Sequence, residues 1–280
     1  MSRQILVVVA CSVVHTAITA LRLGLSWPSA VAGLLTVLVL WRAMEQSRLS
    51  GRELGLALSL VYFGVSFLNT LAEAVLFEVV PASQALSGIA GGALTAFAVI
   101  GCLIMLSGRW KLTPSRTGSV ATLKNGLPWR IFLLALCYCA LYVAAGIAIH
   151  PLIHEFYAGR RLPALPELLA IQFVRGTLYL LVTLPWLRLA AGRRRELTLS
   201  LGLVFSVLGG LAPLLLAAEF MPPAIRLAHA AEVGASNFLF GVITGFVLLA
   251  DGNATIQPRQ ARMSWITLPN TSVRRKSRPL

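Results

Sequence analysis

Charged residues are scarce in this sequence of 280 residues, and acidic residues are the scarcest of them. Only 12% of the residues are charged, with ten acidic residues against 24 lysines and arginines. Soluble domains carry about 25% charged residues, so the composition excludes a soluble globular protein. Hydrophobic residues make up 57% of the chain, which is typical of a membrane protein with several spanning helices.

Signatures of common enzyme chemistry are also absent. The sequence contains no phosphate-binding glycine loop, no GxSxG and no HExxH. The four cysteines lie within apolar runs and lack the spacing of metal ligands. The stretch "FVRGTLY" is similar to the arginine–glycine end of a motif of CAAX-processing membrane proteases, but Ala170 and Ile171 replace the paired glutamates of that motif. That resemblance is rejected, and the sequence names no catalytic residue and no cofactor.

The formal net charge of +14 raises the question of a nucleic-acid partner. Such a partner requires basic residues clustered on a soluble face, whereas the basic residues of this chain flank apolar runs. The positions of the basic residues therefore predict how the chain is oriented in the membrane, and we expect no nucleic-acid partner.

Eight apolar runs are long enough to cross the hydrocarbon core, which requires about 20 residues per helix. They extend over residues 5–23, 25–41, 54–80, 86–107, 131–149, 166–189, 199–218 and 222–250. We predict an all-α bundle of eight transmembrane helices that occupies residues 1–250 of the chain and lies in the lipid bilayer. A likeness between "RQILVVVAC" near the start and "RIFLLALC" from residue 130 does not extend further, so we claim no internal repeat from it.

Basic residues are distributed unevenly between the two sides of these spans. With a cytoplasmic N-terminus, 19 of the 24 lysines and arginines fall on the cytoplasmic side and four on the outer side, while Arg175 lies within a span. The positive-inside rule therefore predicts a multi-pass protein of the plasma (inner) membrane with both termini in the cytoplasm. Residues 251–280 form a basic tail, which we expect to be disordered and able to contact anionic lipid.

The outer half of the eighth span carries a polar stripe in the stretch "IRLAHAAEVGASN". At about 100° per residue, five polar side chains share an arc of about 140°. They are Arg226, His229, Glu232, Ser236 and Asn237. Below them the helix is wholly apolar, so we expect the stripe to face other helices.

Two further spans carry polar groups at the same depth. In the third span, Asn69 and Glu73 are four residues apart and share a helix face, while Glu78 lies nearer the headgroups. In the sixth span, Arg175 lies about 13 Å below the start of the helix. Each buried charge costs about 3 kcal/mol at the bilayer centre, so these charges have to be paired.

The cost of burial predicts that the third, sixth and eighth spans converge. We expect Arg175 to pair with Glu73 or Glu232. The expected partners for the remaining hydrogen bonds are Asn69, Ser236 and Asn237.

Histidines and small residues offer further interpretations. In "IHPLIHE", His150 and His154 are four residues apart, which would suit zinc ligands on a continuous helix. Pro151 disfavours helix at His150, so we expect the two imidazoles to diverge and predict no metal site.

His15 stands alone in the first span and is expected to bond to a neighbouring helix. The small residues of "SGIAGGALTAFA" and "SVLGGLAPLLLA" predict close helix packing.

The polar cluster predicts a pocket that opens to the extracytoplasmic side and binds or transports a small solute or protons. Glu73 and Glu232 would change protonation, Arg175 would be their counter-charge or an anion ligand, and His229 would titrate with them. Two other classes stay open. One is a metal-assisted, membrane-embedded enzyme that acts on lipid through His150, His154 and His229. The other is an accessory or scaffold subunit whose polar network only holds helices together.

Overall fold

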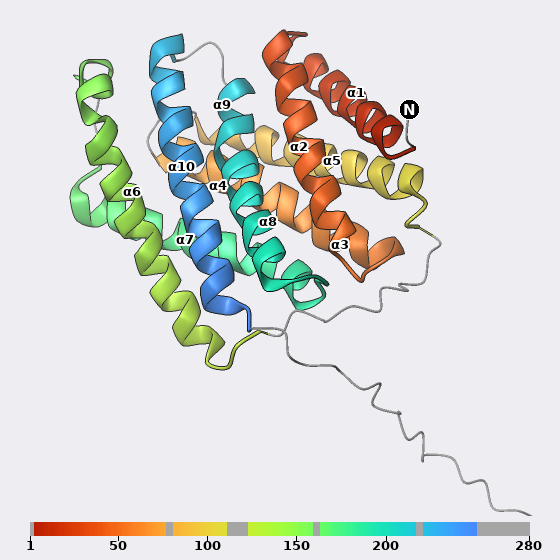
Figure 1. The fold of residues 1–280 in the computed structure, drawn as a ribbon. Coiled ribbons are helices and arrows are strands. Elements are labelled where there is room, and N and C mark those ends of the chain that lie inside the picture. Colours follow the sequence, from red (N-terminus) through yellow and green to blue (C-terminus); the bar gives the residue numbers. More distant parts are fainter. Residues whose placement is uncertain (1–2, 77–80, 111–122, 159–162, 217–220, 251–280) are drawn as a thin grey trace, which may run out of the picture.

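The computed structural model describes residues 3–76, 81–110, 123–158, 163–216 and 221–250. Within these ranges the chain is built from helices and contains no strand (Figure 1). Among the described residues, eight helical segments are long and apolar enough to cross a membrane. The predicted all-α bundle of eight spans is therefore confirmed, while Glu78 and the basic tail at 251–280 lie outside the described residues.

The helices follow one another as four spans and then four more. The first four spans are α1 (Arg3–Leu23), α2 (Trp27–Glu45), the continuous segment of α3 (Gly51–Tyr62), η1 (Phe63–Leu68) and α4 (Asn69–Leu76), and α5 (Ala82–Ser107). The other four are α6 (Leu127–Tyr157), α7 (Leu165–Arg188), the continuous segment of α8 (Arg194–Ser206), η2 (Val207–Leu211) and α9 (Ala212–Leu216), and α10 (Pro223–Leu248). The segments η1 and η2 are π-helical turns, which occur often at functional sites.

The second span was the shortest of the predicted ones, and its local sequence explains why it forms. Ser26 Oγ accepts the backbone N–H of Ser29 at 3.4 Å, and the Ser29 hydroxyl accepts the N–H of Ser26 at 3.2 Å. This capping box provides acceptors for backbone N–H groups that have no partner within the first turn of a helix, and Pro28 suits that turn. The helix α2 is therefore well defined despite its length.

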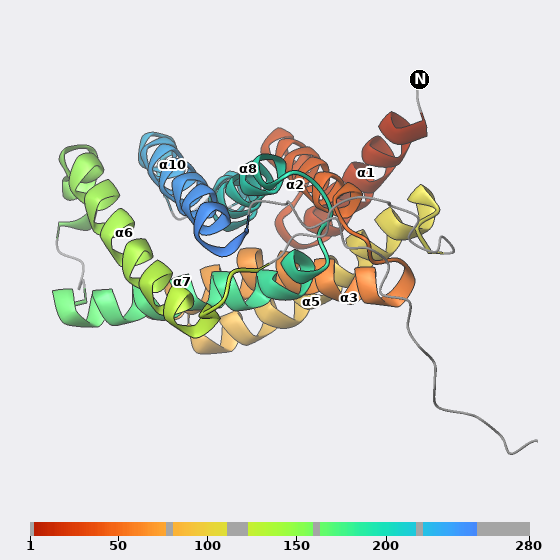
Figure 2. The same ribbon diagram turned by 60° about the horizontal axis from the view of Figure 1, so that its bottom comes forward.

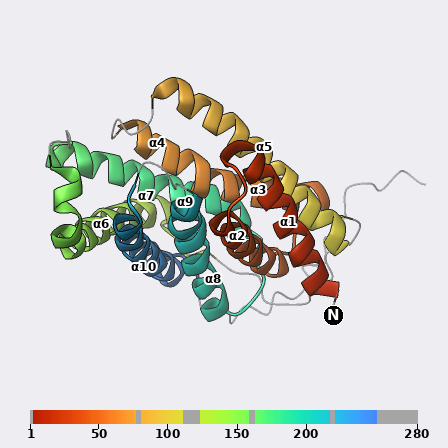
Figure 3. The ribbon, with the colours of Figure 1, turned by 90° about the horizontal axis from the view of Figure 1, so that it is seen from above.

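The eight spans form two groups of four that are related by an approximate two-fold axis. In the first group α1 packs on α2 and α5, and α3 packs on α5; in the second group α6 packs on α7 and α10, and α8 packs on α10. Across the groups, α2 contacts the segment of α8, η2 and α9, and α7 contacts the segment of α3, η1 and α4. Figure 2 shows α10, α8 and α2 in one layer and their counterparts α5, α3 and α7 in the other. In Figure 3, α1 and α6 lie at opposite ends of the bundle.

Sequence and hydrogen bonds follow the same relation, with a shift of 143 residues over the central spans. "RELGLALSLV" from Arg52 and "RELTLSLGLV" from Arg195 are identical at seven of ten positions, and each leads into a π-helical turn. Ser47 and Ala190, also 143 residues apart, form an antiparallel bridge. The two halves are therefore related by an internal repeat, which was not claimed from the sequence. The identical positions of the two "REL" stretches made this register detectable in the sequence, whereas the start of the first span and the start of the fifth span, which were compared above, share little.

The two π-helical turns meet at the centre of the bundle. Ser66 Oγ in η1 donates to the carbonyl oxygen of Leu208 in η2 at 2.7 Å. Gly209 has no side chain, so Tyr179 approaches it closely, and the Tyr179 hydroxyl donates to the Gly209 carbonyl at 3.3 Å. The prediction that the small residues of this stretch mark close helix packing is confirmed.

The lone histidine of the first span is bonded between helices, as expected. His15 is buried, and its Nε2 lies 2.7 Å from the Tyr62 hydroxyl in α3. This bond joins α1 to the third span within the first group of helices.

Candidate functional site

Arg175 lies in the middle of α7, with 5% of its surface exposed. Its Nη1 lies 2.5 Å from Glu73 Oε1 and also donates to Gln172 Oε1 at 2.9 Å. Its Nε donates to Asn69 Oδ1 at 2.9 Å. Of the two carboxylates predicted as its partner, Glu73 makes the ion pair, and Asn69 supplies a hydrogen bond as expected.

Helix periodicity brings these four side chains together. Asn69 and Glu73 lie one turn apart in α4, and Gln172 and Arg175 lie one turn apart in α7. The next residue, Gly176, has no side chain, and a Cβ there would lie 2.8 Å from Tyr138 Cβ. Because α6 can approach α7 at Gly176, the Tyr138 ring lies under the guanidinium, with its centroid 6.0 Å from Arg175 Cζ.

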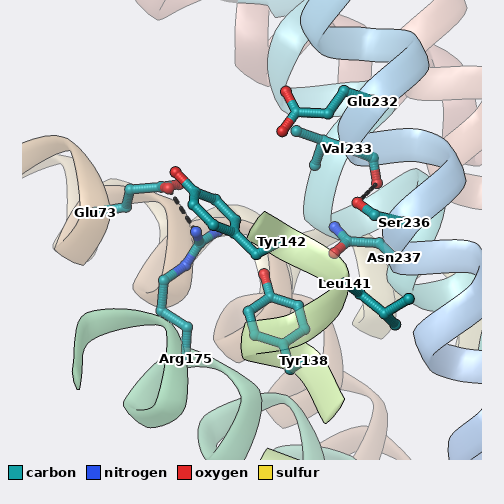
Figure 4. A pocket seen from close by; sticks show the side chains of 9 residues that line it. All are labelled: Glu73, Tyr138, Leu141, Tyr142, Arg175, Glu232, Val233, Ser236 and Asn237. Carbon is teal, nitrogen blue, oxygen red and sulfur yellow. Dashed lines mark hydrogen bonds and ion pairs between the residues drawn. The ribbon is translucent and has the colours of Figure 1, made fainter. Parts of the chain in front are cut away.

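A pocket of about 30 Å³ adjoins the ion pair, between α4, α6, α7 and α10 (Figure 4). Its walls are formed by Glu73, Tyr138, Leu141, Tyr142, Arg175, Glu232, Val233, Ser236 and Asn237. A water molecule needs roughly 10–15 Å³ of such space, so the pocket has room for about two waters. In this conformation it admits water or a proton carrier of similar size.

A hydrogen-bonded chain reaches the pocket from the end of the bundle that is predicted to face outward. The Tyr157 hydroxyl, in the last turn of α6, lies 3.0 Å from His229 Nε2. His229 Nδ1 lies 2.9 Å from Glu232 Oε2, and the Glu232 side chain is 6% exposed. Since Glu232 also lines the pocket, the chain connects the helix ends with the space beside the ion pair.

The deeper side of the pocket is closed by a second set of hydrogen bonds. Asn237 Nδ2 donates to the Tyr179 hydroxyl at 3.3 Å and to the Gly209 carbonyl at 3.2 Å. Ser236 Oγ donates to the carbonyl of Val233 in its own helix at 3.4 Å. Asn237 thus connects the pocket to the π-helical turn η2.

Ser236 and Asn237 were expected to satisfy the remaining hydrogen bonds of the polar cluster, and at Arg175 they do not. Ser236 and Asn237 line the same pocket as Arg175, but neither bonds to its guanidinium. The reason is that α6 packs against both α7 and α10, so its residues Tyr138 and Tyr142 occupy part of the space where a direct bond would form.

Arg226, the remaining residue of the predicted stripe, lies apart from the pocket. It is half-buried in the first turn of α10, and within the described part of the chain its Nε has no hydrogen-bond partner. The structure brings together seven of the eight residues predicted for the site, either in the pocket wall or in bonds to it.

The histidine pair in the fifth span differs from the prediction. The helix α6 continues through Pro151 to Tyr157, and the rings of His150 and His154 are 5.8 Å apart with 29° between their planes. The expected divergence of the rings is wrong, because α6 continues past Pro151 and keeps His150 and His154 one turn apart on the same helix face, although Pro151 removes one backbone hydrogen bond.

A metal site at these histidines finds no support in the geometry. His229, the third ligand of the metal hypothesis, contacts Tyr157 and Glu232 instead. Among the residues with described positions, no three of the types His, Cys, Asp and Glu lie close enough together to hold a metal ion.

Three tyrosines and one glutamine of the site were not predicted from the sequence. Tyr138 and Tyr142 lie in an apolar stretch of the fifth span, where aromatic residues are typical of a packed core. Tyr179 was missed for the same reason. Gln172 was detectable, because it is the one polar side chain a helical turn before Arg175.

Comparisons with protein-family models, with curated proteins and with solved structures find no match for the chain. The fold and the site together define the class as a multi-pass α-helical membrane protein. Its distinguishing feature is a buried ion pair next to a small polar pocket.

Proposed function

We propose that the protein moves protons through the pocket beside Arg175, alone or coupled to a small solute. The observation that carries the proposal is the chain of hydrogen bonds from Tyr157 through His229 to Glu232, which ends at a pocket shared with Glu73 and Arg175. Hydroxyl, imidazole and carboxylate groups within hydrogen-bond distance are the usual components of proton relays in membranes.

The ion pair makes the state of the pocket depend on protonation. When Glu73 is ionised, it neutralises Arg175 across a distance of 2.5 Å. Protonation of Glu73 would leave the buried guanidinium with two neutral acceptors, Asn69 and Gln172. An unpaired charge at this depth costs about 3 kcal/mol, so protonation would favour a conformation in which Arg175 gains water or another anion.

The size of the pocket supports protons rather than a large solute in the conformation described. At about 30 Å³ the space accommodates water and excludes most metabolites. A solute coupled to the protons would therefore bind in another conformation or in another part of the bundle.

Proton movement is testable with purified protein in liposomes that contain a pH-sensitive dye. A potassium diffusion potential set by valinomycin should drive proton uptake by the wild-type protein. Glu232→Gln and His229→Gln should each reduce the rate at least tenfold, since general acid–base groups contribute roughly 100-fold or more to proton-transfer steps.

The matched control is Glu167→Gln, which removes an exposed carboxylate from the first turn of α7, away from the pocket. This variant should transport protons at the wild-type rate. Equal rates of proton uptake in the wild type and the three variants would refute the proposal, provided that size-exclusion chromatography shows each variant to be folded. Loss of folding in Glu232→Gln and His229→Gln, with no proton uptake by the wild type, would favour a scaffold subunit.

A further inference from the structure

The two-fold arrangement of the helices gives the ion-pair pocket a counterpart in the other half of the bundle. The ion-pair pocket lies between α4, α6, α7 and α10. Their counterparts are α9, α1, α2 and α5. These four helices, together with the segment from α3 to α4, enclose a second pocket of about 190 Å³. The larger pocket thus occupies the equivalent position in the repeat.

The second pocket lacks the charged groups of the first. At the shift of 143 residues, Leu216 stands in the place of Glu73, and Ala212 stands in the place of Asn69. Both residues line the second pocket. The same shift places Ala32 where the other half has Arg175. Small or apolar residues replace the ion pair, so the equivalent space is open and mainly apolar.

Hydroxyl groups, the His15 imidazole and one arginine supply the polar part of the second pocket. Thr19, Thr36, Thr70 and Thr95 line it from four different spans. The Tyr62 hydroxyl also lines it and is bonded to His15. These groups are uncharged donors and acceptors around an otherwise apolar space.

Arg22 is the one charged residue in the wall of this pocket. It lies in the last turn of α1, is exposed, and makes no hydrogen bond with a described residue. Gly91 in α5 leaves room for it, because a Cβ at Gly91 would lie 2.7 Å from Arg22 Cζ. The missing side chain allows the guanidinium to rest against α5 beside the pocket, where it can donate to an anion.

We propose that the second pocket binds a small organic acid, with its apolar body inside the pocket and its anionic group at Arg22. An apolar cavity of about 150 Å³ holds benzene, so about 190 Å³ accommodates a ring or a short chain with one attached group. The guanidinium matches a carboxylate in shape and charge. This inference goes beyond proton movement and does not depend on it.

Binding of radiolabelled benzoate to the protein in phosphatidylcholine nanodiscs tests the proposal. Benzoate should bind saturably, and unlabelled benzoate should compete at least tenfold better than benzamide, which has the same ring but no charge. Arg22→Gln should weaken benzoate binding about tenfold, the loss expected for one charge-assisted contact, whereas Arg22→Lys keeps the charge without the planar fork of donors and should weaken it less. Equal competition by benzamide, or wild-type affinity in Arg22→Gln, would overturn the proposal.

The position of the ligand is tested by filling the pocket. Thr70→Leu adds bulk to the wall and should abolish benzoate binding, while Thr177→Leu, on α7 and in the wall of neither pocket, should leave it unchanged. Competition by decanoate as strong as that by benzoate would identify membrane-derived acids as the source of the ligand, and weak competition would identify free small acids.

Glu73→Gln should bind benzoate normally even where it stops proton uptake. Failure of the benzoate proposal can therefore be told from failure of the proton proposal. Unchanged binding in Thr70→Leu would refute the site.

Discussion

Replacing Glu73 with glutamine tests whether the pair with Arg175 stabilises the bundle as its geometry indicates. The substitution removes the negative charge but keeps an acceptor of similar shape beside Nη1. Arg175 stays 5% exposed and keeps its bonds to Asn69 and Gln172. The perturbation is therefore the loss of one charge, with little change in packing.

The magnitude follows from the burial of the two partners. Breaking a fully buried ion pair costs about 3–5 kcal/mol, because the remaining charge has no counterion. The Glu73 side chain is 27% exposed, so water compensates in part. We expect Glu73→Gln to lower the free energy of unfolding by about 2 kcal/mol. When Glu73→Gln is already present, Arg175→Met should lower the free energy of unfolding by less than it does alone. The reason is that it removes the charge that has lost its counterion.

A double-mutant cycle measures this coupling. Wild type, Glu73→Gln, Arg175→Met and the double variant would be unfolded reversibly in mixed micelles with increasing fractions of dodecyl sulfate. We expect a coupling energy of about 2 kcal/mol between the two positions. Exposed Glu167→Gln is the control and should change stability by less than about 0.5 kcal/mol. Additivity of the two single substitutions within about 0.5 kcal/mol would refute the reasoning.

Three further predictions concern packing, an interhelical bond and topology. In Gly241→Ala, the new Cβ would lie 2.5 Å from the Leu201 carbonyl oxygen, so α10 and α8 have to separate, and the free energy of unfolding should fall by about 1–3 kcal/mol. Gly146→Ala places its Cβ in open space and should be neutral or stabilising in the same titration; equal losses in both variants would contradict the packing argument. Tyr62→Phe leaves His15 Nε2 without its partner and should cost about 1 kcal/mol, and a wild-type unfolding midpoint would argue against this bond. A C-terminal fusion should fluoresce with green fluorescent protein and be inactive with alkaline phosphatase, because the basic loops predict a cytoplasmic C-terminus; the reverse result would invert the topology.

The internal repeat explains why the two pockets differ in chemistry. Both halves use the same helix packing and the same π-helical turns, so the backbone provides equivalent spaces twice. Glu73 and Asn69 in one half correspond to Leu216 and Ala212 in the other. A few substitutions thus convert a charged pocket the size of about two waters into a larger apolar one. The scaffold is shared, and the side chains decide what each pocket accepts.

The sequence by itself determined the eight spans and the residues that had to be paired. Span length follows from bilayer thickness, and the cost of an unpaired charge in lipid does not depend on the fold. Arg175, Glu73 and Asn69 were therefore predictable as one cluster, and the shared helix face of Asn69 and Glu73 follows from local periodicity.

Only the tertiary structure decided which partners meet. Both Glu73 and Glu232 satisfied the depth argument for Arg175, and the choice of Glu73 depends on α6 packing between α7 and α10. The tyrosines of α6 join the pocket for the same reason. Such contacts join residues far apart in sequence, so periodicity and hydropathy carry no information about them, and the order in which helices pack determines the site.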